Sequence, residues 1–158
     1  MASIRTETVI DAPLEQVWAA LRDWGALHER LVPGFVTDTR LDGNDRIVTF
    51  ADGAVVREVL IDLDDDANRI AWTIVDGPYT HHNGSAQVFS EDDGRTRFVW
   101  ITDLLPDELA APTAKRMEQG TRVVRGTQEG RVAAPTSAPP GRAAVPATAT
   151  DSRRAAPQ

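Results

Sequence analysis

A chain of 158 residues has room for one domain with a sizeable core, and the absence of cysteine excludes disulfides, thiolate metal sites and a cysteine nucleophile. The net charge is −7, and because residues 130–158 carry +3, residues 1–129 carry −10. A domain that acidic repels phosphate backbones, so we expect no nucleic-acid partner.

The start of the chain shows no targeting signal. The sequence MASIRTETVIDAP has neither the basic start nor the apolar run of a signal peptide. No segment approaches the roughly 20 apolar residues that span a bilayer. We therefore expect a cytoplasmic protein without a membrane span, and a reducing compartment suits a chain without cysteine.

The chain opens with a predicted strand and two predicted helices. Residues 3–10 alternate between apolar and polar side chains, which indicates a strand. Asp11 is expected to cap a helix that has Pro13 in its first turn and apolar residues at helical spacing over 14–21. A second, short helix is expected over residues 24–31.

Six short β-prone segments follow. They cover residues 35–41, 46–51, 54–63, 69–75, 81–90 and 95–103. Asp-Gly pairs and other short glycine-containing loops separate them, and such loops commonly connect hairpins because glycine accepts a positive φ at low steric cost. We therefore expect six successive antiparallel strands linked by hairpins.

A long helix is predicted after the last strand. Apolar residues between 109 and 124 recur at intervals of mostly three and four. Pro112 is expected to prevent an uninterrupted start, so we expect a turn over 106–111 and the main helix over 112–129.

Glycines weaken this helix, and the composition changes after it. Gly120 and Gly126 each cost about 1 kcal/mol relative to alanine inside a helix, so the helix needs the sheet to hold it. Residues 130–158 contain nine Ala and five Pro and few large apolar side chains. We expect a folded domain over 1–129 and a disordered Ala/Pro-rich tail over 130–158.

The order of one strand, two helices, six strands and a long helix is that of the helix-grip fold. The segments that carry a family likeness are Thr8–Pro13, Val17–Leu21, Val56–Glu58, Arg69–Trp72 and Phe98–Trp100. On these segments the chain resembles the polyketide cyclase/dehydrase and lipid-transport group of the START-like superfamily, also called SRPBCC. The resemblance covers about residues 3–129. It implies an α+β fold in which a curved seven-stranded antiparallel sheet surrounds a long C-terminal helix, in the order β-α-α-β-β-β-β-β-β-α.

The resemblance also implies an internal cavity for a hydrophobic or aromatic ligand such as a polyketide or lipid. The family has no invariant catalytic motif. In its register, alternate residues of the strands face the helix. The predicted ligand-binding side chains are Val56, Glu58, Leu60, Trp72, Ile74, His82, Phe98 and Trp100.

Glu58 and His82 are the polar members of this predicted pocket. They could bind a hydroxyl or carbonyl of the ligand, or act as a general acid–base pair in an aldol-type cyclisation or dehydration. Alternatively, Glu58 pairs with Arg57, Arg69 or another neighbour, and His82 has only a structural role. Their catalytic role therefore stays open.

A metal or cofactor site is not expected. His81 and His82 are adjacent in a strand, so they point to opposite faces and cannot easily chelate one ion. The sequence shows no phosphate-binding glycine loop, nucleophile elbow or dinucleotide fingerprint.

Three functions remain open at this point. The favoured hypothesis is a binder of a small hydrophobic molecule, acting as a monomer or weak homodimer. The second is a polyketide cyclase, aromatase or dehydratase that uses Glu58 and His82. The third is a protein-interaction module that uses the outer surface of the sheet.

Overall fold

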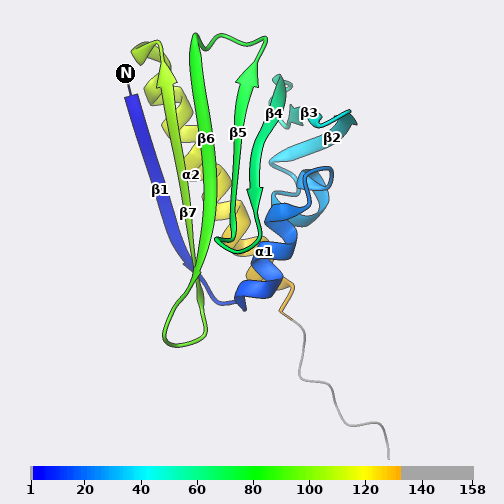
Figure 1. Cartoon of the computed structure of the whole chain (residues 1–158), viewed down its shortest axis with the longest axis vertical. Helices are drawn as coiled ribbons and strands as arrows, with labels where there is room; N and C mark the ends of the chain where they lie inside the picture. Colours follow the sequence, from blue (N-terminus) through cyan, green and yellow to red (C-terminus); the bar gives the residue numbers. More distant parts are fainter. Residues whose placement is uncertain (1, 133–158) are drawn as a thin grey trace, which may run out of the picture.

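A computed structural model describes residues 2–132. Seven antiparallel strands form one sheet in the order β1-β7-β6-β5-β4-β3-β2 (Figure 1). The strands are β1 (Ala2–Ile10), β2 (Val36–Asp42), β3 (Asp45–Phe50), β4 (Val55–Asp64), β5 (Arg69–Val75), β6 (His81–Ser90) and β7 (Thr96–Leu105). The predicted α+β helix-grip architecture is confirmed. The tail predicted over 130–158 lies, from residue 133 onward, outside the described residues.

The helices occupy one side of this sheet. They are α1 (Leu14–Arg22), the single π-helical turn η1 (Leu27–Leu31), the short 3₁₀ turn η2 (Asp107–Leu109) and the long α2 (Ala110–Gly130). In Figure 1, α2 runs behind the sheet alongside β1 and β7. Its apolar face is buried at Met117 and Val124, and the hydroxyls of Thr6 in β1 and Thr121 in α2 are hydrogen-bonded at 2.8 Å.

Three helix boundaries differ from the predictions. The helix α2 begins at Ala110, so Pro112 lies in its first turn and does not prevent the start. A first-turn N–H has no acceptor within the helix, so a proline there loses nothing. Pro13 rather than Asp11 occupies the N-cap position of α1, and no side chain caps the helix. The second helix, expected over 24–31, is the shorter η1.

The C-terminal end of α2 is tied to α1 and η1. Gln128 is buried, its side-chain amide donates to the carbonyl oxygen of Arg30 at 2.8 Å, and its own backbone carbonyl accepts from the Gln16 amide at 2.8 Å. Just past α2, the Arg131 guanidinium donates to the carbonyl of Glu29 at 2.6 Å. These bonds fix one end of the helix against α1 and η1, and the part of α2 before that end borders the cavity described next.

Candidate ligand-binding cavity

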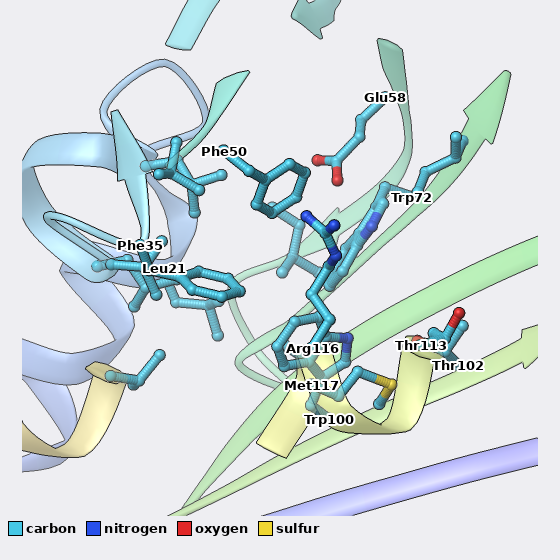
Figure 2. A pocket seen from close by; sticks show the side chains of 18 of the residues that line it. Leu21, Phe35, Phe50, Glu58, Trp72, Trp100, Thr102, Thr113, Arg116 and Met117 are labelled. Carbon is cyan, nitrogen blue, oxygen red and sulfur yellow. The ribbon is translucent and has the colours of Figure 1, made fainter. Parts of the chain in front are cut away.

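A cavity of about 90 Å³ lies between the sheet, α2 and the segment around η1. Most of its lining is apolar. Figure 2 shows Trp72 and Glu58 on one side of it, Phe35 and Leu21 on another, and Met117 on the α2 side. The cavity therefore lies where α2 packs against the sheet.

Six of the eight side chains predicted from strand parity line this cavity. They are Glu58, Trp72, Ile74, His82, Phe98 and Trp100. Val56 and Leu60 share the face of β4 that carries Glu58, but they pack partly buried against the core and do not line the cavity. The cavity meets β4 only around Glu58, and parity cannot predict how far along a strand a cavity extends.

Two glycines make room for the two tryptophans of the cavity. The rings of Trp72 and Trp100 lie 6.3 Å apart. A Cβ atom at Gly84 would lie 2.8 Å from Cε2 of Trp72, and one at Gly120 would lie 2.9 Å from Cζ3 of Trp100. Such distances are too short for carbon atoms in van der Waals contact. Gly120, one of the two glycines that weaken α2, therefore allows the helix to pack closely against the ring of Trp100.

Glu58 forms a buried ion pair with Arg46, a residue that the sequence analysis did not single out. The two residues lie opposite each other in the antiparallel pairing of β3 and β4. Nε and Nη2 of Arg46 both lie 2.6 Å from Oε2 of Glu58, and only 6% and 8% of the two side chains is exposed. The guanidinium also stacks on the ring of Trp24 at 3.6 Å. Burial lowers the pKa of Arg46, and the charge of Glu58 opposes that shift.

The two arginines that were named as possible partners of Glu58 do not pair with it. Arg57 lies on the opposite face of β4 and forms ion pairs with Asp42 at 2.8 Å and with Asp45 at 2.9 Å. Arg69 forms no ion pair within residues 2–132. The partner is therefore the other neighbour that the prediction left open, and only the hairpin register between β3 and β4 identifies it.

His82 is held by the end of strand β5. Pairing between β5 and β6 stops at Trp72 and Gly84, and the Ile74 N–H beyond this point donates to Nδ1 of His82 at 3.1 Å. Burial lowers the pKa of His82 to about 4, and the neighbouring His81 adds to the shift. His82 is therefore neutral at pH 7. Because Nδ1 accepts a hydrogen bond, the ring proton is on Nε2.

A second, more polar space adjoins the cavity. This outer cleft has a volume of about 300 Å³, and it shares Phe35, Phe50 and Arg116 with the inner cavity. Arg116 lies 4.2 Å above the ring of Phe50 and donates to Asp52 at 2.9 Å. Lys115 also lines the cleft. Strand parity could not find this site, because Phe35 lies in the turn before β2, Phe50 is the last residue of β3, and the two cations lie on α2.

Among the residues that line the cavity, not every polar side-chain atom finds a partner within residues 2–132. The Tyr79 hydroxyl and the Thr113 hydroxyl are hydrogen-bonded at 2.8 Å. Nε1 of Trp100, in contrast, is buried and has no hydrogen-bond partner among residues 2–132. An unpartnered buried donor is unfavourable, and a molecule that brings an acceptor to it would remove that cost.

The described part of the chain offers no cluster of three or more acidic or histidine side chains placed to hold a metal ion. No helix within residues 2–132 is both long enough and apolar enough to cross a bilayer.

Comparison with known proteins identifies a family and several structures of the same fold. The family described as "Polyketide cyclase / dehydrase and lipid transport" matches residues 1–134. No curated protein sequence matches the chain. An uncharacterized protein of Bacillus thuringiensis aligns with a TM-score of 0.71 at 19% identity, covering 79% of this chain and 97% of that one.

Two further structures are similar. The protein XoxI of Bacillus cereus has a TM-score of 0.70 at 20% identity, with 81% of this chain and 96% of that one covered. A Thermobifida fusca protein has a TM-score of 0.66 at 25% identity, with 82% and 91% covered. None of their names states a ligand.

Proposed function

Because the chain belongs to the polyketide cyclase/dehydrase and lipid transport family, we propose that it binds a small hydrophobic or aromatic molecule in the cavity between the sheet and α2. We further propose that it binds this molecule as a monomer or weak homodimer. The absence of cysteine suits a protein that works in the reducing cytoplasm.

The observation that carries this proposal is the apolar cavity with two tryptophans in its wall. Ligand sites are commonly apolar concave spaces with a few convergent polar groups. The glycines at 84 and 120 leave space for the Trp72 and Trp100 rings, which would otherwise collide with β6 and α2. The unpartnered Nε1 of Trp100 adds a donor for an acceptor atom of the ligand.

The geometry favours binding over acid–base catalysis by Glu58 and His82. A general base needs a free lone pair near the reacting atom. The lone pair of His82 Nδ1 accepts the Ile74 N–H, and Oε2 of Glu58 accepts a hydrogen bond from Nε of Arg46 and lies in ion-pair contact with Nη2. A cyclase, aromatase or dehydratase mechanism would be left with Oε1 of Glu58 as the base and the weakly acidic Nε2–H of the neutral His82 as the acid. A cavity that both residues reach also supports a ligand-binding function over an interaction module that uses the outer face of the sheet.

Binding can be tested with the neutral fluorophore N-phenyl-1-naphthylamine. We expect its emission to rise on addition of the folded protein, with quenching of tryptophan fluorescence from Trp72 and Trp100. Ala86 is buried and lines the cavity, so Ala86→Leu should fill it and weaken binding at least about tenfold, which corresponds to roughly 1.4 kcal/mol. Ala111→Leu makes the same change at an exposed position of α2 and should leave binding unchanged.

Folding of each variant is checked by circular dichroism. If Ala86→Leu does not fold, Ile74→Phe fills the cavity from a half-buried position. Equal dye binding by the wild type and by a folded cavity-filling variant would exclude the cavity as the site.

Mass spectrometry separates a carrier from an enzyme once a bound metabolite is known. We expect the wild type to leave that molecule chemically unchanged. A cyclised or dehydrated product made by the wild type and lost in both Glu58→Gln and His82→Asn would establish catalysis instead.

A further inference from the structure

The inner cavity on its own is too small to enclose the dye named above or a ligand of similar size, so such a molecule must reach beyond it. Its volume is about 90 Å³. An apolar cavity of roughly 150 Å³ is known to take up benzene, and sites for larger small molecules commonly measure about 300–1,000 Å³. A molecule with one ring and a short chain would therefore have to extend beyond the inner cavity.

The outer cleft is the space into which such a molecule would extend. It measures about 300 Å³ and is separated from the inner cavity by the three side chains that line both spaces, Phe35, Phe50 and Arg116. The two rings meet edge to face at 5.5 Å, and Arg116 lies over Phe50. The Arg116–Asp52 ion pair beside these rings is 35% and 61% exposed. Rotation of these side chains would join the two spaces.

The two spaces differ in the charge that they offer a ligand. Inside, the charge of Glu58 is compensated by Arg46, and most of the other lining is apolar. Outside, Lys115 and Arg116 face a single carboxylate, Asp52, so these three side chains leave a net charge of +1. This local excess of positive charge stands out in a domain that carries −10 over residues 1–129.

Some N–H donors of Lys115 and Arg116 in the outer cleft remain available for hydrogen bonds to a ligand. Asp52 already accepts from the Ala54 N–H at 2.9 Å as well as from Arg116. Lys115, the single lysine of the sequence, is exposed, and no carboxylate among residues 2–132 forms an ion pair with it. The remaining N–H groups of Arg116 and the Lys115 ammonium are therefore open to an anionic group.

Resting on the ligand-binding function proposed above, we propose that the ligand is an amphipathic organic acid. Its apolar part lies in the inner cavity beside Trp72 and Trp100. Its carboxylate lies in the outer cleft against Lys115 and Arg116. The rings of Phe35 and Phe50 pack around the part of the molecule that passes between the two spaces.

The experiment compares three molecules that share one apolar body and differ in charge. They are 4-phenylbutyrate, 4-phenylbutanol and 4-phenylbutylamine, titrated against tryptophan emission at pH 7 and low salt. The acid is expected to bind about tenfold more tightly than the alcohol, and the amine most weakly. Added salt should reduce the preference for the acid, because exposed charges are screened.

Variants locate the origin of this preference. In Lys115→Gln/Arg116→Gln the acid and the alcohol should bind within about twofold of each other. Arg122→Gln removes an exposed cation from the same helix, away from both spaces, and should keep the wild-type ratio. If the double variant does not fold, the exposed Lys115→Gln alone should lower the ratio.

The outcomes separate this proposal from the function on which it rests. Wild-type binding of the alcohol as tightly as the acid, or a preference that survives in the folded double variant, would overturn the organic-acid proposal while leaving cavity binding intact. Failure of all three molecules and of the neutral dye to bind would remove the ligand-binding function itself.

Discussion

Two arginine–carboxylate pairs lie at the inner cavity and the outer cleft, and they differ in burial far more than in geometry. Arg46 and Glu58 are joined at 2.6 Å, and Arg116 and Asp52 are joined at 2.9 Å. The first pair is only 6% and 8% exposed, whereas the second is 35% and 61% exposed. Water can replace a partner in the exposed pair but not in the buried one. The buried pair is therefore a fixed part of the wall, and the exposed pair can open without a large cost.

The largest effect should come from breaking the buried pair. Glu58→Gln leaves the buried guanidinium of Arg46 without a compensating charge, so we expect the free energy of unfolding to fall by about 3 kcal/mol, measured by urea denaturation. The double variant Arg46→Met/Glu58→Leu replaces both charges by apolar groups and should recover most of that loss. Unchanged stability of Glu58→Gln would show that Arg46 finds water or another partner.

Burial should also make the stability depend on pH through His82. Its pKa falls from 6.5 to about 4 on folding, so the unfolded chain binds more protons between these values. The stabilisation is fully present above pH 6.5 and is lost as the pH falls toward 4. Allowing for partial solvation, the wild type should lose about 2 kcal/mol more than His82→Asn between pH 7 and pH 4.

Asparagine can still accept the Ile74 N–H, which makes this variant a suitable control for the titration. Urea denaturation at several pH values gives both curves. If the two curves run parallel from pH 7 to pH 4, folding does not lower the pKa of His82.

The same contrast between inside and outside can be tested by replacing two glycines of α2 with alanine. Gly120→Ala would place a methyl group 2.9 Å from Trp100 and 3.2 Å from Phe35, so we expect a net loss of about 1 kcal/mol despite the better helix propensity of alanine. Gly126→Ala meets nothing within 4 Å and should gain about 0.5 kcal/mol. Thermal and urea unfolding measure both, and a gain in both variants would mean that the cavity wall yields easily.

The smallest effect should come from the exposed pair. Asp52→Asn removes the carboxylate that holds Arg116, yet we expect the urea midpoint to stay at its wild-type value because water solvates the freed guanidinium. A loss of stability comparable to that of Glu58→Gln would show that the partition between the two spaces is a rigid part of the fold.

Local sequence patterns predicted the elements of this fold well. Turn residues between short β-prone segments predicted β2 to β7, and apolar residues at intervals of three and four predicted α2. Strand parity placed Glu58, Trp72 and His82 on the face that looks toward the helix, because side chains in a strand alternate strictly. The ends of the helices were less accurate, since the first turn of α2 tolerates Pro112.

Only the tertiary structure decided which of those side chains meet and how much space they leave. The pairing of Glu58 with Arg46 follows from the register across one hairpin, and the size of the cavity follows from how closely α2 approaches the sheet at Gly120. The three side chains that separate the two spaces come from the turn before β2 (Phe35), the end of β3 (Phe50) and the distant helix α2 (Arg116). Periodicity describes one element at a time, whereas a cavity is the space left among several elements, so its volume and its mouth depend on contacts that no single segment specifies.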